Sequence, residues 1–303
     1  MRKDKLRRTM LYAPGNSPAL LQNAAVYGAD SVCFDLEDSV ATSEKDSARL
    51  MVYHALTRLK FPAEVGVRIN HIATPWGYAD LEQILAANPA FIRLPKGETA
   101  AEIKEIDRVI SQAEEKYGFA AGSIGLVVSI ENPKGLRNAY DIASASPRVL
   151  AIAIGGEDFA ASLKTEKSKG NSITGGRELF TARTMLVFAA REAEVQALDS
   201  VFSDLNDEEG LAEEVTLIKE LGFDGKSCVN PRQIEIIHSV FSPGEKEIAY
   251  AQRVLAAYQE ALEKKSGVIS LNGKMIDAPM IVRAERVLAN AGVAAPKGGK
   301  INA

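Results

Sequence analysis

The sequence predicts an α/β barrel of eight parallel strands, and three observations support this fold. Short apolar runs alternate with helical patterns along the first 242 residues. Most of these runs lack the polar alternation of a half-exposed strand, which indicates a parallel sheet covered by helices. We count eight such runs, and eight strands favour a closed TIM (β/α)8 barrel, with an open doubly wound sheet as the alternative.

The strands are justified in order by the turn residues and helical patterns between them. The first helix is expected to begin at Pro18, after Ser17, and to end at Gly28. Longer helical patterns cover residues 101–117 and 211–221. The expected strands are Thr9–Ala13, Ser31–Asp35, Val65–Asn70, Ala90–Leu94, Ile124–Ile130, Val149–Ile154, Ala197–Phe202 and Gly225–Val229.

The alternation stops after about Ser242, so the C-terminal part is expected to lie outside the barrel. Two helices are predicted there, at 243–265 and 279–291, joined by a loop at 266–273. The predicted domains are a catalytic barrel at 1–242, a helical extension at 243–291 that packs on a neighbouring subunit, and a flexible tail at 292–303.

Composition and charge exclude several classes of protein. The net charge of −4 gives no basic field for binding nucleic acid. No apolar run reaches the ~20 residues of a membrane span, and no apolar segment follows the basic N-terminus, as a secretory signal would require. Cys33 and Cys228 lie in apolar runs and are predicted to be buried thiols. A reducing cytoplasmic location is therefore expected.

Acidic residues follow several of the predicted strands. The active site of such a barrel is built at the carboxyl ends of its strands. Asp35, Glu37 and Asp38 follow strand two, Arg68 and Asn70 belong to strand three, Lys96 follows strand four, Glu131 follows strand five, and Gly155, Gly156, Glu157 and Asp158 follow strand six. The two glycines indicate either a close backbone approach or a tight turn. The polar segment Lys164–Ser172 is interpreted as a solvated loop or an active-site lid.

Carboxylates converging at one end of a barrel repel one another, and a divalent cation removes that repulsion. Only oxygen ligands are on offer at these positions, which favours Mg²⁺ or Mn²⁺. Glu131 and Asp158 are the predicted ligands. The alternative is that each carboxylate caps the helix that follows it.

Arg68 lies in a strand otherwise built of apolar residues. Its guanidinium either binds an oxyanion of the substrate or forms a structural ion pair with Asp35, Glu37 or Asp38, and both roles can hold. Lys96 and Lys226 end strands four and eight. Either lysine could form a Schiff base, as in a metal-free aldolase, and the alternative is a lysine paired with carboxylates.

A set of segments from Arg8 to about Ala289 resembles the citrate lyase β / malyl-CoA lyase family. The segments occur in the family's order and are specific as a set, with one departure, Gly156, where relatives often have alanine. The chain length and residues 51–56 and 268–279 favour the citrate lyase branch. The matching segments are Phe34–Val40, Val67–Asn70, Arg93–Lys96, Ile130–Pro133, Gly156–Asp158, Gly222–Ser227, Asn230–Ile234 and Asn272–Asp277.

The resemblance implies a TIM barrel that forms a homotrimer and binds Mg²⁺ through Glu131 and Asp158. It implies retro-Claisen cleavage of a citryl thioester to oxaloacetate and an acetyl thioester. The partners would be the acyl carrier protein subunit and the acyl-transferase subunit of a citrate lyase complex. A free-standing lyase of malyl-CoA or citramalyl-CoA and a non-catalytic scaffold subunit are the alternatives.

The expected roles follow from this reaction. Arg68 would stabilise the enolate oxygen, and Glu37 or Asp38 would relay the proton of the substrate hydroxyl. Asp277, reaching into a neighbouring subunit's site, would protonate the enolate carbon. The residues expected to bind substrate are Arg68, Asn70, Lys96, Glu131 and Gly156.

Overall fold

The structure is a computed structural model that describes residues 5–165, 177–263, 269–271 and 274–293. The chain divides into two compact units, Met1–Phe241 and Ser242–Ala303. Each unit is described by itself below. Among the described residues, none of the helices is both long enough and apolar enough to span a membrane.

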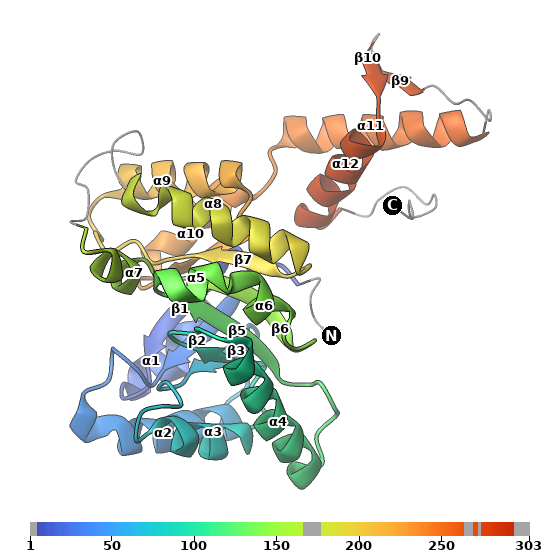
Figure 1. Cartoon of the computed structure of the whole chain (residues 1–303). Helices are drawn as coiled ribbons and strands as arrows, with labels where there is room; N and C mark the ends of the chain where they lie inside the picture. Colours follow the sequence, from blue (N-terminus) through green and yellow to red (C-terminus); the bar gives the residue numbers. More distant parts are fainter. Residues whose placement is uncertain (1–4, 166–176, 264–268, 272–273, 294–303) are drawn as a thin grey trace. The chain divides into compact units, whose positions relative to one another are not determined.

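The first unit is a closed barrel of eight parallel strands in sequence order, with β8 beside β1, and helices lie outside the strands (Figure 1). This confirms the predicted TIM barrel and each of its eight strands. The strands are β1 Thr9–Pro14, β2 Ser31–Asp35, β3 Glu64–Arg68, β4 Phe91–Leu94, β5 Gly125–Ile130, β6 Val149–Ile154, β7 Gln196–Asp199 and β8 Gly225–Cys228.

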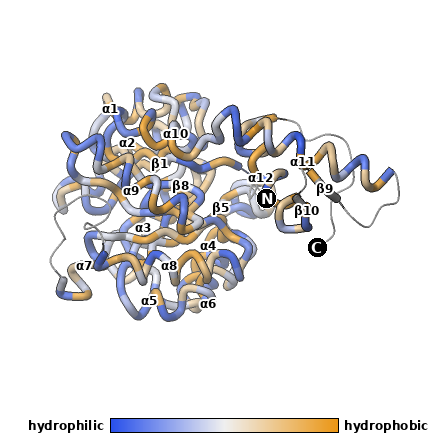
Figure 2. The backbone as a smooth tube through the Cα atoms, turned by 90° about the horizontal axis from the view of Figure 1, so that it is seen from above, coloured by the Kyte–Doolittle hydropathy of each residue, from blue (hydrophilic) through white to orange (hydrophobic). Residues whose placement is uncertain are grey.

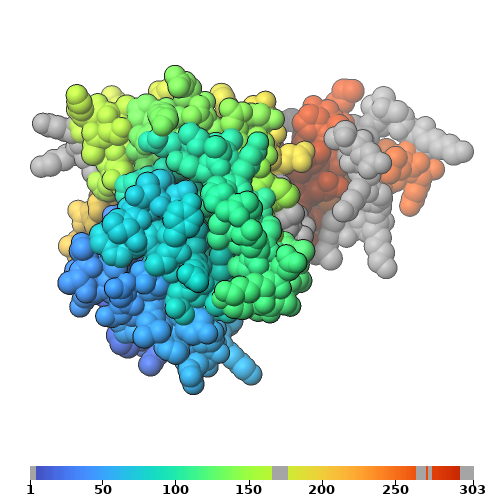
Figure 3. All heavy atoms as spheres, turned by 60° about the horizontal axis from the view of Figure 1, so that its bottom comes forward, coloured from blue at the N-terminus to red at the C-terminus, as the bar shows by residue number. Residues whose placement is uncertain are grey.

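Helices with one apolar face cover the barrel, and the alternation of hydrophobic and hydrophilic residues along them can be followed in Figure 2. In Figure 3 the blue-to-green segment that carries α2 to α4 forms one continuous face. The helical elements are α1 Pro18–Asn23, η1 Ala24–Tyr27, η2 Thr42–Glu44, α2 Lys45–Arg58, α3 Gly77–Leu85, α4 Ala100–Tyr117, α5 Pro133–Arg137, α6 Ala139–Ser144, α7 Gly156–Leu163, α8 Arg177–Glu192, α9 Glu208–Leu221 and α10 Arg232–Phe241.

Helix α4 shows how local sequence sets these boundaries. The Thr99 side chain accepts a hydrogen bond from the backbone N–H of Glu102, whose carboxylate in turn accepts from the backbone N–H of Thr99. This capping box satisfies two backbone donors that the first helical turn leaves without a partner. The helix ends at Gly118, which adopts φ 71°, a left-handed conformation that glycine allows without steric cost.

Alternate residues of the strands contribute to two hydrophobic clusters. The larger cluster, with Val32, Phe34 and Val67, packs against the helices. The smaller cluster includes Cys33, which lies between Val32 and Phe34 on β2, together with Met10 of β1 and Phe91 of β4. It therefore faces the barrel interior. Cys33 and Cys228 are both free and buried, as predicted, and burial raises the pKa of each thiol to about 12.

The second unit contains α11 Glu245–Glu263, β9 Ile269–Leu271, β10 Lys274–Ile276 and α12 Ala278–Asn290. Its buried side chains include Val254, Leu255, Ile281 and Leu288 from the two helices. The predicted loop at 266–273 is wrong for Ile269–Leu271, which pairs antiparallel with Lys274–Ile276. Two short apolar runs on either side of Asn272-Gly273 are a hairpin signal, so the sequence itself favours a hairpin over a plain loop here.

Two further predictions fall mainly on residues that the structure does not describe. Residues 166–172 of the predicted lid lie outside the described residues, and so do residues 294–303 of the predicted tail. The packing of the helical extension on a neighbouring subunit stays a prediction.

Candidate active site

A cavity of about 450 Å³ lies at the carboxyl ends of the barrel strands. Five predicted site residues line it, and Glu37, Asn70 and Lys96 are not among its lining residues. The lining residues are Tyr12, Pro14, Asp35, Asp38, Ser39, Arg68, Arg93, Glu131, Ile154, Gly155, Gly156, Glu157, Asp158, Ser200, Val201, Ser227 and Val229.

Arg68 is oriented by a bidentate ion pair with Asp35. Its Nε and Nη2 donate to the two Asp35 carboxylate oxygens at 2.6 and 2.7 Å. Burial alone would raise the pKa of Asp35, but the hydrogen bonds and charge of Arg68 hold it below its usual value. The remaining nitrogen, Nη1, lies 3.1 Å from Glu37 Oε2 and 3.3 Å from Asp38 Oδ2. The structural ion pair between Arg68 and Asp35 that the sequence suggested is therefore present. The contacts of Nη1 are longer than those of Nε and Nη2.

Glu37 and Lys96 form a second ion pair beside the cavity. The Lys96 ammonium lies 2.5 Å from Glu37 Oε1 and 3.9 Å from Glu131 Oε2. Burial raises the pKa of Glu37, against the opposing effect of Arg68 and Lys96. Burial alone would lower the pKa of Lys96, but the hydrogen bond and charge of Glu37 raise it. Lys96 is therefore an ammonium at neutral pH, which does not suit a Schiff-base nucleophile.

Glu131 is a buried carboxylate at the cavity. Glu131 is 5% exposed, and its Oε2 atom is buried without a hydrogen bond. Burial, together with the charges of Glu37 and Asp158, raises its pKa to about 7. The alternative role as a helix cap is not observed, because the Asn132 side chain caps α5 by accepting from the backbone N–H of Gly135.

Two glycines leave space at the cavity, Gly155 beside Glu131 and Gly156 beside Ser200. A Cβ on Gly155 would lie 2.4 Å from Glu131 Cγ, and a Cβ on Gly156 would lie 2.8 Å from Ser200 Oγ. Side chains at these positions would displace Glu131 or its surroundings. Asp158 is exposed in the first turn of α7 rather than at a strand end. Its carboxylate is near the positive end of the α7 dipole, but it does not cap the helix, because the N-cap position is Gly155 and no side-chain cap hydrogen bond is present.

Two other predicted site residues, Asn70 and Asp277, form hydrogen bonds with other groups of the protein. The Asn70 amide donates to Leu36 O at 2.8 Å and to Asp80 Oδ2 at 2.7 Å, which uses both of its N–H groups. Asp277 belongs to the second unit, where its side chain caps α12 by accepting from Met280 N at 3.1 Å. Whether either residue also contacts a substrate stays a prediction.

Lys226 faces away from the cavity. Its ammonium lies 2.7 Å from Asp199 Oδ2 and 2.5 Å from Glu214 Oε1, in a buried cluster that includes Arg183 on α8. Burial alone would raise the pKa of Asp199, but Arg183 and Lys226 lower it. The paired-lysine alternative is therefore observed, and Lys226 has no place in the cavity lining.

Tyr12 and Arg93 also line the cavity, and neither was among the predicted site residues. The Tyr12 ring lies between two arginines, with the Arg68 and Arg93 guanidinium carbons 4.8 and 5.1 Å from its centroid. The signal available for Arg93 was a charged residue within the apolar run Phe91–Leu94. The charge alone could not tell whether a carboxylate from another strand meets it.

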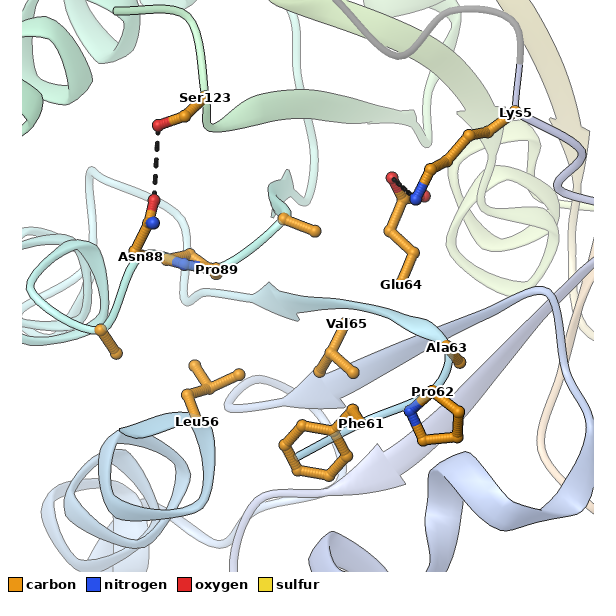
Figure 4. A pocket seen from close by; sticks show the side chains of 12 residues that line it. Lys5, Leu56, Phe61, Pro62, Ala63, Glu64, Val65, Asn88, Pro89 and Ser123 are labelled. Carbon is orange, nitrogen blue, oxygen red and sulfur yellow. Dashed lines mark hydrogen bonds and ion pairs between the residues drawn. The ribbon is translucent and has the colours of Figure 1, made fainter. Parts of the chain in front are cut away.

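A second cavity, of about 400 Å³, lies at the opposite end of the barrel (Figure 4). Its lining includes Lys5 and Glu64, whose charged groups lie 3.8 Å apart, and Arg7 makes a further ion pair with Glu64. Because these charges compensate one another, the first cavity is the stronger candidate for the active site.

The cavity carboxylates suit a hard cation. The described residues contain no group of three or more His, Cys, Asp or Glu side chains arranged as metal ligands. Mg²⁺ often takes only one or two protein carboxylates and fills its other positions with water and substrate. The unbonded Glu131 oxygen and the neighbouring charge of Asp158 meet that requirement.

The chain is similar in sequence to proteins of one known family. The family model described as HpcH/HpaI aldolase/citrate lyase matches residues 8–231. The citrate lyase subunit beta of Leuconostoc mesenteroides subsp. cremoris is 47% identical over 294 residues, which are 96% of each chain. The L-malyl-CoA/beta-methylmalyl-CoA lyase of Cereibacter sphaeroides is 31% identical over 94% of each chain.

A solved structure extends the similarity to the fold. The protein CitE from Mycobacterium tuberculosis, in complex with magnesium, acetoacetate and coenzyme A, aligns with a TM-score of 0.77 at 30% identity. The alignment covers 95% of this chain and 99% of that chain. On this sequence and fold similarity, the chain belongs to the HpcH/HpaI aldolase/citrate lyase family, and it is a lyase.

Proposed function

We propose that this lyase cleaves a citryl thioester to oxaloacetate and an acetyl thioester with the help of Mg²⁺. The observation that carries the proposal is the Glu131 carboxylate, which is buried, has an oxygen without a hydrogen bond and has a pKa raised to about 7. An enzyme that keeps a carboxylate in this state has use for a cation or a proton beside it. The relative named citrate lyase subunit beta supports the substrate class.

Glu131 and Asp158 would hold the metal ion. Bound Mg²⁺ would supply Lewis acidity toward the oxygens of the substrate. The magnesium in the CitE complex from Mycobacterium tuberculosis supports the choice of ion. Gly155 serves the same site, because its missing side chain leaves the space that the Glu131 stem occupies.

Arg68 stabilises negative charge on the thioester oxygen as the carbon–carbon bond breaks. Asp35 fixes two of its nitrogens, so the guanidinium needs little reorganisation. Its Nη1, with the longer contacts to Glu37 and Asp38, can exchange them for the developing enolate oxygen. Asn70 orients the loop after β3 through Leu36 and Asp80, and this would place Arg68 from the same strand.

Two proton transfers complete the reaction. Glu37 or Asp38 relays the proton of the tertiary hydroxyl, and the raised pKa of Glu37 brings it nearer to neutral pH, where a general base works best. Asp277 of a neighbouring subunit protonates the enolate carbon to give the acetyl thioester. The Lys96 ammonium balances Glu37 and Glu131, and Gly156 lets the backbone approach the substrate.

Oxaloacetate release from citryl thioesters tests the proposal. Activity should require Mg²⁺ or Mn²⁺, disappear with a chelator and fall by at least about 100-fold in Glu131→Gln. The matched control is Glu105→Gln, a partly exposed glutamate on α4 that pairs with Arg108. Activity that survives complete chelation would remove the metal from the mechanism.

The carrier is resolved in the same assay. We propose that the thioester is presented by an acyl carrier protein, with an acyl-transferase subunit and a homotrimer of this chain in one cytoplasmic complex. Citryl groups on carrier protein should then be cleaved faster than citryl-CoA. Faster turnover of malyl-CoA or citramalyl-CoA would favour the alternative of a free-standing lyase, the activity named for the Cereibacter relative.

A further inference from the structure

Arg93 is a buried arginine at the cavity with no carboxylate partner among the described residues. The residue is 2% exposed. Its Nε donates to Ser129 Oγ at 3.0 Å, and its Nη1 lies 3.1 Å from Met10 Sδ and 3.3 Å from Ser227 Oγ. Within the described part of the chain, its Nη2 has no hydrogen bond. All of these neighbours are neutral.

The other buried arginines are all neutralised. The described residues include three besides Arg93, and each lies within 3 Å of a carboxylate oxygen. The pairs are Arg7 with Glu64, Arg148 with Asp107 and Glu114, and Arg183 with Asp199. Among the buried arginines that the structure describes, Arg93 is therefore the exception. A guanidinium removed from water without a counter-ion is unfavourable unless something else supplies the negative charge.

The position of Arg93 indicates where that charge comes from. It lines the cavity together with Arg68, and the two guanidiniums lie against the same Tyr12 ring, at 4.8 and 5.1 Å. Arg68 is already held by Asp35. The cavity thus presents one arginine with its own carboxylate and one that lacks a carboxylate. A ligand carboxylate in the cavity would satisfy the second, since a guanidinium matches a carboxylate in shape and charge.

The substrates under consideration differ in this group. A malyl or citramalyl thioester has a single free carboxylate, next to the hydroxyl that the reaction uses. A citryl thioester has that carboxylate and a second one on a methylene arm. We propose that Arg93 binds the second carboxylate and thereby selects citryl thioesters, an inference that rests on the proposed cleavage reaction. Arg93 is then a specificity-determining residue, separate from Arg68 and the metal ligands.

The test pairs two ligands that differ by this carboxylate. Oxaloacetate and pyruvate are both 2-oxo acids, and pyruvate lacks the carboxylate of the methylene arm. Their dissociation constants are measured by calorimetry on the full chain with Mg²⁺, for the wild type and Arg93→Met. We expect the wild type to prefer oxaloacetate and the variant to lose about 10- to 100-fold of that preference. Pyruvate affinity should stay within about threefold.

Thermal unfolding supplies the control for a purely structural role. Arg93→Met removes a buried charge without a carboxylate partner, so its melting temperature should equal or exceed that of the wild type. Arg148→Met, a buried arginine outside the cavity that pairs with Glu114 and Asp107, should melt at a lower temperature. A clear drop for Arg93→Met, with equal loss of both ligands, would show a structural role and overturn the inference.

The remaining outcomes separate this inference from the proposed function. A folded Arg93→Met protein that keeps the full preference for oxaloacetate would overturn the inference, whether or not citryl thioesters are cleaved. A wild type that fails to cleave citryl thioesters, while its preference for oxaloacetate is abolished in Arg93→Met, would remove the proposed reaction and the selection of citryl thioesters, and would support only the binding of the methylene-arm carboxylate by Arg93. Kinetics provide a further check, because KM for the citryl thioester should rise in Arg93→Met while turnover of citramalyl thioester is retained.

Discussion

Replacing Glu131 with glutamine should change how stability depends on pH. The pKa of Glu131 is raised from 4.5 to about 7 by burial and by the charges of Glu37 and Asp158. In the unfolded chain the carboxylate ionises near its ordinary value. Between about pH 4.5 and pH 7 the folded state therefore holds a proton that the unfolded state has lost.

The sign and size follow from proton linkage. A raised carboxylate pKa makes metal-free stability fall as pH rises through this window, and the loss is complete above the folded pKa. At about 1.4 kcal/mol per pH unit, a rise from 4.5 to about 7 corresponds to roughly 3 kcal/mol. Glu131→Gln removes this contribution. The variant should be more stable than the wild type at pH 8 without metal, and the two should converge near pH 4.5.

Urea unfolding without metal at pH 5, 6, 7 and 8 measures this difference, with Glu105→Gln as the control for a surface glutamate. Calorimetry of Mg²⁺ binding gives the second measurement. With a pKa near 7, the wild type should release about half a proton per bound ion at pH 7. Its affinity for Mg²⁺ should be about tenfold weaker at pH 6 than at pH 8. Parallel stability profiles for wild type and Glu131→Gln would refute the burial argument, and pH-independent Mg²⁺ binding would refute Glu131 as a ligand.

Three further variants or treatments probe the cavity. Gly155→Ala should weaken Mg²⁺ binding at least about tenfold, because its Cβ would lie 2.4 Å from Glu131 Cγ; unchanged affinity by calorimetry would contradict the close approach. Arg68→Lys should lose about 10²–10³-fold in kcat and roughly 1–3 kcal/mol of stability, because one ammonium cannot replace the bidentate contact to Asp35. Borohydride with substrate should leave Lys96 unmodified by mass spectrometry, because its raised pKa keeps it protonated; a trapped adduct would restore the aldolase mechanism.

The sequence predicted the barrel well because each strand is a short apolar run that needs no distant information. Ser31–Asp35 and Val149–Ile154 were predicted with the bounds that the structure shows. The seventh strand was predicted to reach Phe202, but it ends at Asp199. Val201 and Phe202 extend the apolar run beyond Asp199, but they are not part of the strand. Apolar character alone cannot show where the hydrogen bonding between strands stops.

Side-chain pairing was harder to predict than the strands. Asn70 was predicted to end the third strand and to bind substrate, but the strand ends at Arg68 and the Asn70 amide donates to Asp80 of α3, ten residues later in the chain. Arg93 was not among the predicted site residues, although it lies in the matching segment Arg93–Lys96. Whether a carboxylate pairs with Arg93 depends on which residues of the neighbouring strands lie beside it in the barrel. The register of the closed barrel decides which side chains are neighbours, and local spacing in the sequence does not reveal it. In this barrel the register places Arg68 of β3 beside Arg93 of β4.

Asp277 provides the last prediction, because its contact in the structure and its expected role differ. The side chain accepts from Met280 N at 3.1 Å and caps α12, so Asp277→Ala should cost about 0.5–2 kcal/mol in stability. Asp277→Asn keeps the cap and loses the proton donor. If Asp277 acts as an acid, Asn should be as inactive as Ala, and if it acts only as a cap, Asn should restore activity. Mixed oligomers of Asp277→Asn and Arg68→Ala then decide whether the acid serves another subunit's site. Regained activity requires active sites built from two chains, while inactivity in demonstrably mixed oligomers would place the acid and Arg68 of each site on one chain.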